Sequence, residues 1–345
     1  MPFQYLRPEK IAALSVRQLG RYKDAAFDHW RSKGFPYPKL SRSQLEQQYR
    51  QFAMSCRSVF GRGRSITWSP LGLGIANFFH PHMWAVKCQY FRSPVQVFRN
   101  DTLLAHCIDR SLRINTDRTP LNANNMRVML ATFSNTKRVS NFRPTAARAL
   151  YQRYSRDGDI IVDPSAGFGG RLLGALPLDR EYIGIEPNTQ SVKGMSRLLD
   201  ALSGHPLTKG RGRVLQGRCE TLLPKLPGRY AAMVISSPPY FARERYGRGR
   251  EQSWVRYPEY EEWKTHFLAS QMREIHRILQ PGGFYCLNVE NTETHAVADD
   301  AIAIARQFFR PFFVYKLMIG CVPYHRNGQR GGHRSERLLV FQKGR

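Results

Sequence analysis

Short apolar runs bounded by glycine, proline or charged residues recur along the second part of the chain. Each run has the length of a β-strand, and helical patterns lie between several of them. Gln271–Leu279, for example, has helical periodicity and is followed by Pro281-Gly282-Gly283, which ends a helix. The predicted strands lie near 159–163, 181–186, 212–216, 230–234, 284–289, 312–322 and 336–342. This alternation predicts an α/β domain over residues 138–345.

Residues 1–137 precede this domain and need a separate explanation. Leu40–Tyr49 has the pattern of a serine-capped helix, and Gly61–Ser65 is expected to be a flexible basic loop suited to phosphate groups. Aromatic side chains are dense over 66–92, where they either stack on nucleic-acid bases or form a local core. We expect residues 1–137 to form a basic N-terminal region with a possible role in nucleic-acid or target recognition.

The chain is strongly basic. It has 53 Lys and Arg against 26 Asp and Glu, which gives a net charge of +27 at pH 7. The surplus occurs in both parts of the chain. Because phosphate neutralisation dominates the affinity of proteins for nucleic acids, a surplus of this size indicates a polyanionic partner. The alternative is a charge that only keeps the protein in solution.

A proline-rich turn, Ser237-Pro238-Pro239-Tyr240, follows the apolar run that begins at Tyr230. The two prolines fix φ and remove two N–H donors, so the carbonyl groups of the turn can only accept hydrogen bonds. The hydroxyl of Ser237 precedes the two prolines, and the aromatic ring of Tyr240 follows them. Such a turn can accept hydrogen bonds from an amino group while a flat ring stacks beside it. An ordinary turn after a buried strand is the simpler alternative.

A glycine-rich turn lies upstream, directly after the strand predicted near 159–163. Its sequence is Asp163-Pro164-Ser165-Ala166-Gly167-Phe168-Gly169, and the start of a helix follows. Gly167 and Gly169 let the backbone approach a ligand closely, and the helix start offers free N–H groups. The next predicted strand ends in Glu186, 17 residues after Gly169. At this spacing a carboxylate can accept both hydroxyls of a ribose.

These motifs, in this order, resemble the class I S-adenosylmethionine-dependent amino-methyltransferases of the DNA N4-cytosine and N6-adenine type. The resemblance covers roughly residues 138–345 and implies a Rossmann-like sheet of seven strands, in which the last two pair antiparallel. It implies S-adenosyl-L-methionine as the cofactor and the exocyclic amine of a nucleic-acid base as the methyl acceptor.

The resemblance also implies roles for particular residues. Ser237 Oγ and the Pro238 carbonyl would accept the N–H groups of the target amine, Pro239 would shape the turn, and Tyr240 and Phe241 would stack on the target ring. Positioning and electrostatics would do most of the catalytic work. The residues expected to bind the cofactor are Phe142, Asp163, Pro164, Ser165, Gly167, Gly169, Glu186, Pro187, Cys219, Glu220 and Ser236.

Two arginine-rich loops, 243–250 and 325–334, flank the expected acceptor pocket. Both contain glycines and lie where the substrate enters this fold, so we expect them to contact phosphate groups; loops that are basic only for solvation are the alternative. The residues expected to bind substrate are Phe241, Arg243, Arg245, Arg248, Arg250, Arg326, Arg330 and Arg334.

Several targets are compatible with the resemblance. Serine before the two prolines is typical of N4-cytosine enzymes, so cytosine N4 in DNA is the first expectation and adenine N6 the second. Phe168 and Gly170 replace the Ser and Thr usual in that loop, and the order of the two motifs differs from most N4-cytosine enzymes. The alternatives are an RNA or protein (glutamine-type) N-methyltransferase and a non-catalytic nucleic-acid-binding subunit of the same fold.

The six cysteines are scattered, with no Cys-x-x-Cys pair, which argues for a reducing compartment and against a structural zinc site. We therefore expect no metal. No run of 18 apolar residues occurs and the first residues lack a signal-peptide core, so we expect no membrane partner. A cytoplasmic, nucleoid-associated protein is expected. The acid-poor N-terminus leaves organelle import open, although Glu9, Asp24 and Asp28 argue against it. The sequence does not indicate an oligomeric state.

Overall fold

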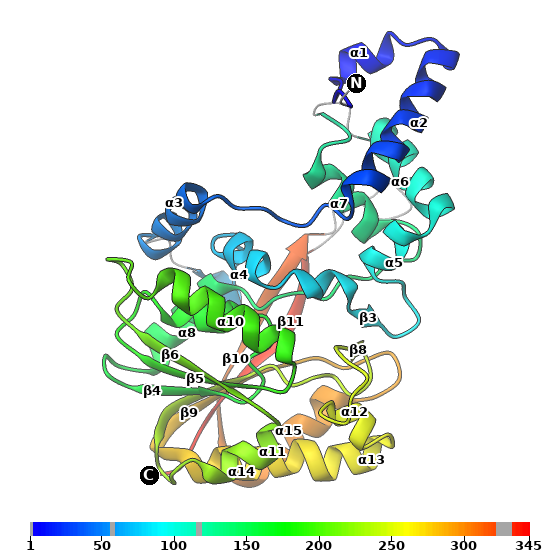
Figure 1. The fold of residues 1–345 in the computed structure, drawn as a ribbon. Helices are drawn as coiled ribbons and strands as arrows, with labels where there is room; N and C mark the ends of the chain where they lie inside the picture. Colours follow the sequence, from blue (N-terminus) through cyan, green and yellow to red (C-terminus); the bar gives the residue numbers. More distant parts are fainter. Residues whose placement is uncertain (1–2, 56–58, 115–118, 322–332) are drawn as a thin grey trace. The chain divides into compact units, whose positions relative to one another are not determined.

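The computed structural model describes residues 3–55, 59–114, 119–321 and 333–345. The chain forms two compact units, drawn in Figure 1: a helical unit of residues 1–39 and 81–140, and a sheet unit of residues 40–80 and 141–345. The boundary expected near residue 137 lies close to the observed boundary at 140. Residues 40–80, however, belong to the sheet unit, because their side chains pack into one of its two cores.

The helical unit has its own hydrophobic core, in which Trp30 of α2 packs with side chains of α6 and α7. The longest helix, α2, begins at a capping box: Ser15 Oγ accepts from the N–H of Gln18, and Gln18 Oε1 accepts from the N–H of Ser15. The elements of this unit are α1 (Pro8–Ala12), α2 (Val16–Lys33), η2 (Pro81–Ala85), β3 (Lys87–Cys88), α5 (Pro94–Arg99), α6 (Asp101–Ile114) and α7 (Ala123–Thr132).

The sheet unit is built on one large sheet in the strand order β1-β2-β10-β11-β9-β7-β4-β5-β6. Strands β6, β5, β4, β7 and β9 are parallel, and β11 runs antiparallel to both β9 and β10. The strands are β1 (Phe60–Gly61), β2 (Ser65–Ile66), β4 (Ile160–Asp163), β5 (Glu181–Glu186), β6 (Arg211–Gln216), β7 (Ala231–Ser236), β9 (Leu279–Val289), β10 (Arg310–Cys321) and β11 (His333–Gln342), with the separate short strand β8 (Glu244–Arg245).

Helices cover both faces of this sheet, so the unit has three layers (Figure 1). On one face lie α3 (Arg42–Ala53), α4 (Leu73–Phe79), α8 (Pro144–Tyr154), α9 (Gly170–Ala175) and α10 (Thr189–Leu202). On the other lie α11 (Cys219–Leu222), η3 (Leu223–Lys225), the π-helical segment η4 (Trp263–Ala269), α14 (Ser270–Ile278) and α15 (Val297–Phe308). The short helices α12 (Ser253–Arg256) and α13 (Tyr260–Glu262) precede η4.

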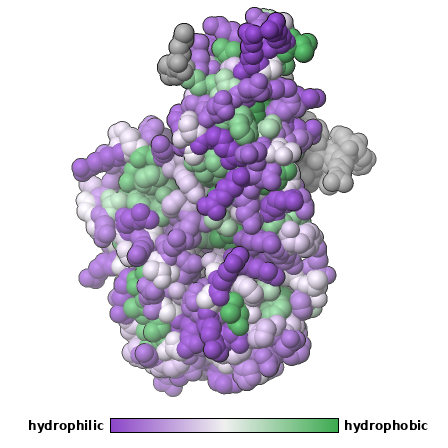
Figure 2. Space-filling view, turned by 45° about the vertical axis from the view of Figure 1, so that its right-hand side comes forward, coloured by the Kyte–Doolittle hydropathy of each residue, from purple (hydrophilic) through white to green (hydrophobic). Residues whose placement is uncertain are grey.

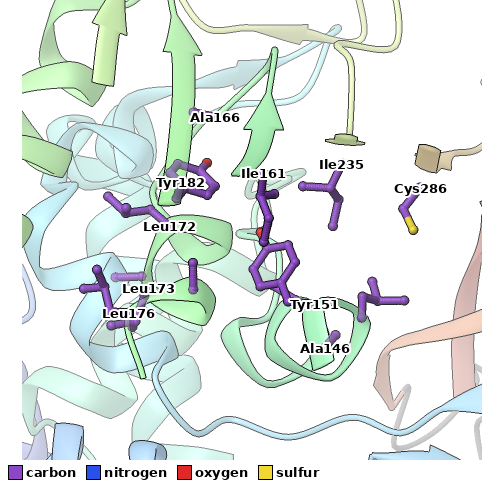
Figure 3. Close-up of a cluster of buried hydrophobic side chains, with 14 of the residues drawn as sticks. Ala146, Tyr151, Ile161, Ala166, Leu172, Leu173, Leu176, Tyr182, Ile235 and Cys286 are labelled. Atoms are coloured by element: carbon purple, nitrogen blue, oxygen red, sulfur yellow. The ribbon is translucent and has the colours of Figure 1, made fainter. Parts of the chain in front are cut away.

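Each face of the sheet is buried in a separate hydrophobic core. Alternate residues of a strand point to opposite faces, so Ile161 enters the first core and Val162 the second. Figure 3 shows part of the first core, where Tyr151 of α8 lies against Ile161 of β4 and near Ile235 of β7. Burial on both faces is the pattern expected of a central parallel sheet.

The fold class expected from the sequence is confirmed, but within the described residues the sheet has nine strands instead of seven. The additional strands come from residues 60–66, where a flexible loop was expected. Here Arg62–Arg64 form a tight helical turn between β1 and β2, and β2 pairs in parallel with Lys316 and Leu317 of β10. An unpaired strand edge attracts any extended segment within reach, which explains the addition at β10.

Most of the aromatic side chains of the 66–92 segment are at least partly buried, whereas Trp68 and Tyr90 are exposed. Hydrophilic residues cover much of the face drawn in Figure 2, with small hydrophobic areas between them. Among the helices of the described residues, none combines the length and the apolar character needed to cross a membrane.

Candidate active site

The carboxyl ends of the parallel strands β4, β5, β7 and β9 meet at one edge of the sheet. The chain runs from β4 outward to β5 and β6, then returns to β7 on the other side of β4. This change of direction between β4 and β7 is a topological switch point, where open α/β sheets bind their ligands. The glycine-rich turn follows β4, Glu186 ends β5, and the proline-rich turn follows β7. The fold therefore brings these three motifs together.

The glycine-rich turn has the backbone that its sequence predicts. Gly167 and Gly169 have φ values of +61° and +70°, which a side chain would strain. A Cβ on Gly167 would meet only the Ser165 carbonyl oxygen, at 3.7 Å, so the outer side of the turn leaves room for a ligand. Pro164 and Ser165 lie in the same turn, between β4 and Gly167.

Residues 141 and 142, of which Phe142 is predicted to bind the cofactor, pack on this turn. Asn141 Nδ2 donates to the carbonyl oxygen of Phe168 at 2.9 Å. A Cβ on Gly170 would lie 2.0 Å from the Phe142 carbonyl oxygen, so the contact requires glycine there. The Phe142 ring lies beside the guanidinium of Arg171, with 5.3 Å between the Cζ atom and the ring centroid.

The carboxylate of Asp163, expected at the cofactor, is fully buried and bound within the protein. Its Oδ2 accepts from Arg171 Nε at 2.6 Å and from the Tyr182 hydroxyl at 2.6 Å. Its Oδ1 accepts from the backbone N–H of Ser165 at 3.1 Å. Arg171 also donates to the Ser165 carbonyl oxygen. These contacts hold the ends of the glycine-rich turn, so Asp163 supports the turn from inside.

Glu186, predicted from the sequence to accept the hydroxyls of a ribose, is the last residue of β5. Its side chain is 8% exposed. Oε2 accepts from the N–H of Gly167 at 2.8 Å, and Oε1 accepts from the N–H of Asn188 at 2.9 Å, just beyond Pro187. Burial raises the pKa of Glu186 to about 7, although both backbone bonds oppose the shift. Each carboxylate oxygen retains a further lone pair for a ligand hydroxyl.

Cys219 and Glu220, expected to bind the cofactor, begin α11 just beyond β6. The Cys219 thiol is buried, accepts from Gln271 Nε2 at 3.1 Å and lies 3.3 Å from Glu220 Oε2. Glu220 forms an ion pair with Arg256 that is largely shielded from solvent. Both side chains thus have partners within the protein at this end of the sheet.

The proline-rich turn starts at the end of β7. Ser236, the last residue of the strand, is fully buried, and its Oγ has no hydrogen-bond partner among the described residues. Ser237 Oγ donates to Asn288 Oδ1 of β9 at 3.4 Å. Tyr240 is 6% exposed, and its hydroxyl donates to Glu336 Oε2 of β11 at 3.3 Å. Burial, followed by the charge of Glu336, raises the pKa of Tyr240 well above its usual value.

Asn288 and Glu336 were not among the residues expected at the site. Both lie inside segments that the sequence marks only as strands, and a single polar residue in a strand gives no signal of its function. Their positions depend on β9 and β11 pairing side by side, with Asn288 opposite Leu338. Arg143 also lies near Glu336: its guanidinium donates to the Ile319 carbonyl oxygen, and burial lowers its pKa to about 10.

Phe241, expected to stack on the target ring, points into the second core. Its φ of +55° turns the chain away after Tyr240. The Phe241 ring contacts Tyr260, Trp263 and His295, with ring centroids 5.2 to 5.7 Å apart. The Phe241 ring therefore belongs to the packing of the second core, together with the Tyr240 ring, whose hydroxyl reaches Glu336.

The arginines of loop 243–250 divide into two groups. Arg243 is mostly buried, pairs with Glu244 at 3.6 Å and lies over the Tyr240 ring at 5.5 Å. Arg245, Arg248 and Arg250 are exposed. Asn188 Nδ2 donates to the Tyr246 carbonyl oxygen at 3.0 Å, which ties the loop to the end of β5.

The second arginine loop is largely outside the described residues. Arg326 and Arg330 lie beyond them, and Arg334 is placed only by its backbone, which pairs with Gly320. No group of three His, Cys, Asp or Glu side chains that could hold a metal ion occurs in the described part of the chain. The ring nitrogens of His80 both lie within hydrogen-bonding distance of backbone carbonyl oxygens, of Ala76 and Ser191.

Comparison with known proteins agrees with this geometry. Residues 231–345, from β7 to the C-terminus, match the model of a family described as DNA methylase. The match supports methyltransferase activity of the DNA N4 or N6 type, with S-adenosylmethionine as the cofactor, and does not resolve the base. No curated protein matches the chain.

Three solved structures are similar to part of this chain. TrmN from Thermus thermophilus is 18% identical over 58% of this chain and 48% of its own, with a TM-score of 0.39. A SAM-dependent methyltransferase from Methanosarcina mazei is 12% identical over 56% of this chain and 97% of its own, with a TM-score of 0.37. A methyltransferase from Pyrococcus furiosus is 13% identical over 59% and 83%, with a TM-score of 0.37. The chain thus spans about half the length of TrmN.

Proposed function

We propose that this protein transfers the methyl group of S-adenosylmethionine to the exocyclic amine of a nucleic-acid base. Cytosine N4 in DNA is the first candidate and adenine N6 the second. One observation carries the proposal: the glycine-rich turn with Glu186 and the Ser-Pro-Pro-Tyr turn lie on either side of the switch point between β4 and β7. A methyl donor and an amine acceptor held there would be neighbours.

The residues on the donor side fit S-adenosylmethionine. The open side of Gly167 and the two remaining lone pairs of Glu186 suit a ribose and the chain attached to it. Phe142 packs at the other end of the turn, and the buried Ser236 hydroxyl at the end of β7 is left to bond a polar group. When bound, the cofactor supplies an electrophilic methyl group on a sulfonium centre.

On the acceptor side, the protein has to make a poor nucleophile reactive. The lone pair of a base amine is delocalised into the ring. Ser237 Oγ and the Pro238 carbonyl oxygen would accept its two N–H bonds and favour a pyramidal nitrogen whose lone pair faces the methyl group. Tyr240 would hold the base by stacking. A base in duplex DNA must first leave the helix, which costs a few kcal/mol.

The charge of the protein supports a nucleic acid as the substrate. The net charge is +27, and Arg245, Arg248 and Arg250 are exposed on the loop that follows the proline-rich turn. Phosphate groups on either side of an extruded base would lie near such a loop. RNA and protein glutamine amides offer the same kind of nitrogen, so they are the competing acceptors.

The test is methyl transfer from a labelled donor to DNA, RNA and protein in parallel, followed by digestion and identification of the modified nucleoside or amino acid by mass. We expect N4-methylcytosine in DNA. Ser237→Ala should abolish most of the product while S-adenosylmethionine still binds, which separates failed chemistry from failed folding. Label found only in RNA or in protein would replace the DNA assignment, and no labelled product with any acceptor would refute the proposal.

A further inference from the structure

The serine at the start of the proline-rich turn raises a problem of hydrogen-bond direction. A carboxylate or an amide oxygen at this position can only accept a hydrogen bond. A serine hydroxyl both donates and accepts, and its proton rotates to suit its neighbours. To accept an N–H from the substrate amine reliably, Ser237 must direct its own proton to another acceptor inside the protein.

Asn288 provides that acceptor. The Ser237 hydroxyl donates to Asn288 Oδ1 at 3.4 Å. This distance is long for O–H···O, as hydrogen bonds at active sites often are before the substrate binds. Asn288 is 3% exposed, so its amide has no bulk water to bond instead. The lone pairs of Ser237 are then left for the substrate.

The orientation of the Asn288 amide is fixed by its other end. Its Nδ2 donates to Glu336 Oε2 and to the Arg337 carbonyl oxygen, both at 3.2 Å. Both partners can only accept, so a flipped amide would place its oxygen against two oxygens. The donor end must therefore face β11, and Oδ1 must face Ser237.

Glu336 organises Tyr240 in the same way. Its Oε2 accepts the proton of the Tyr240 hydroxyl at 3.3 Å as well as that of Asn288. One carboxylate therefore fixes both the amide of Asn288, which orients toward Ser237, and the hydroxyl proton of Tyr240.

We propose that Asn288 and Glu336 are positioning residues that fix Ser237 as a hydrogen-bond acceptor and so select amino groups as methyl acceptors. The inference rests on the proposed function of this turn. Neither residue needs to touch the substrate, since both act through Ser237. An enzyme with Asp in the place of Ser237 would not need them, because a carboxylate has no proton to direct.

The different needs of a serine and an aspartate at position 237 provide the test. Asn288→Ala and Glu336→Ala are each made in two backgrounds, one with the native Ser237 and one with Ser237→Asp. The single-turnover rate of methyl transfer is then measured on the amino acceptor that the wild type uses. With Ser237 in place, each change should lower the rate by roughly 10- to 100-fold, as when a group that orients a ligand is removed. With Ser237→Asp, Asn288→Ala should leave the rate unchanged or raise it, since it removes the oxygen that faces the new carboxylate. Glu336→Ala should lower the rate much less than it does with Ser237, since the carboxylate has no proton to direct.

Two controls separate positioning from folding. Glu336→Gln keeps an acceptor oxygen for Asn288 and Tyr240, so it should retain most of the activity that Glu336→Ala loses. Asn291→Ala removes a neighbouring asparagine that bonds Asp299 and the start of α15. Any loss of activity caused by Asn291→Ala should be the same fraction with Ser237 and with Ser237→Asp. Affinity for S-adenosylmethionine should be unchanged in all the variants.

Equal losses from Asn288→Ala in both backgrounds would show a merely structural role and overturn the inference while the proposed function stands. No loss from Asn288→Ala or Glu336→Ala with Ser237 in place would overturn it as well. If wild type methylates no amine in DNA, RNA or protein, the proposed function fails, and with it the need to fix Ser237 as an acceptor.

Discussion

Buried polar side chains at the ends of strands give the candidate site its chemical character. Glu186 is held between two backbone N–H groups in surroundings that raise its pKa to about 7. Tyr240 and Asn288 are buried beside Glu336, which is itself partly exposed. In a medium of low polarity, the direction of each hydrogen bond matters more than in water, because an unpaired group costs more there.

The pH dependence of cofactor binding should report on Glu186. Ligand hydroxyls that donate to the carboxylate favour its ionised form, so binding lowers the pKa of Glu186 and releases a proton. Affinity for S-adenosylmethionine should therefore rise as the pH increases toward about 7 and level off above it. Calorimetry between about pH 5 and pH 8 measures this.

Glu186→Gln should bind the cofactor more weakly, by about 1.5 to 3 kcal/mol above pH 7, since it removes a charge-assisted hydrogen bond. Its affinity should also lose the rise with pH. Unchanged affinity in this variant would show that the end of β5 does not hold the cofactor.

The hydroxyl and the ring of Tyr240 should contribute separately to methyl transfer. Tyr240→Phe keeps the ring and loses only the bond to Glu336, whereas Tyr240→Ala also removes the stacking surface. Stacking on an aromatic side chain is worth about 1 to 3 kcal/mol per base, so the alanine variant should lose substantially more activity. Single-turnover rates at saturating cofactor decide this. Equal rates for the two variants would argue against stacking by Tyr240.

At the scale of elements, the glycine-rich turn is held from several sides. The buried pair of Asp163 and Arg171 anchors its ends, and residues 141 and 142 cover it. His80, at the end of α4, lies behind it: a Cβ on Gly169 would be 3.0 Å from the His80 ring. Each of these contacts joins the turn to a different part of the sheet unit, so its shape is set before a ligand arrives.

Gly170→Ala tests this support. The new Cβ would lie 2.0 Å from the Phe142 carbonyl oxygen, so segment 141–142 must move away from the turn. We expect a loss of about 1 to 3 kcal/mol in the free energy of unfolding, together with weaker cofactor binding. Gly204→Ala, where nothing lies within 4 Å of the new Cβ, is the matched control. Denaturant titration measures the free energy of unfolding of both variants, and calorimetry measures their cofactor affinity. If Gly170→Ala and Gly204→Ala gave equal values, the close packing at Gly170 would be contradicted.

At the scale of the whole molecule, the dominant property is its charge of +27. Charge on this scale attracts a polyanion over long distances and makes its affinity sensitive to salt. The exposed arginines near the proline-rich turn would convert that general attraction into contacts close to the site.

The salt dependence of DNA binding should change when these arginines are removed. On duplex DNA the slope of log affinity against log salt is about −0.9 per phosphate contact, so replacing Arg248 and Arg250 with Ala should flatten it by up to about two. Cofactor affinity should not change. Replacing Arg156 and Lys225, exposed before β4 and β7 and thus at the opposite edge of the sheet, should have a smaller effect. If both double substitutions changed the salt slope equally, DNA affinity would depend on the total charge of the protein and not on the position of these arginines.

Local sequence determined much of this protein. The seven strands from β4 to β7 and β9 to β11, the helix that ends before Pro281-Gly282-Gly283, and the two turns with their glycines and prolines were predicted, because each depends on residues close together in the chain. The order of the two motifs, with Glu186 between them, was enough to indicate a methyltransferase sheet.

Only the tertiary structure decided how the site is assembled. Ser237 and Asn288 are 51 residues apart, and Tyr240 and Glu336 are 96 apart, so their contacts exist only once β7, β9 and β11 pair. The pairing of residues 65 and 66 with β10 and the burial of Phe241 depend equally on distant partners. A residue's type limits the bonds it can form, but the neighbour that it bonds is chosen by the packing of strands far apart in the chain.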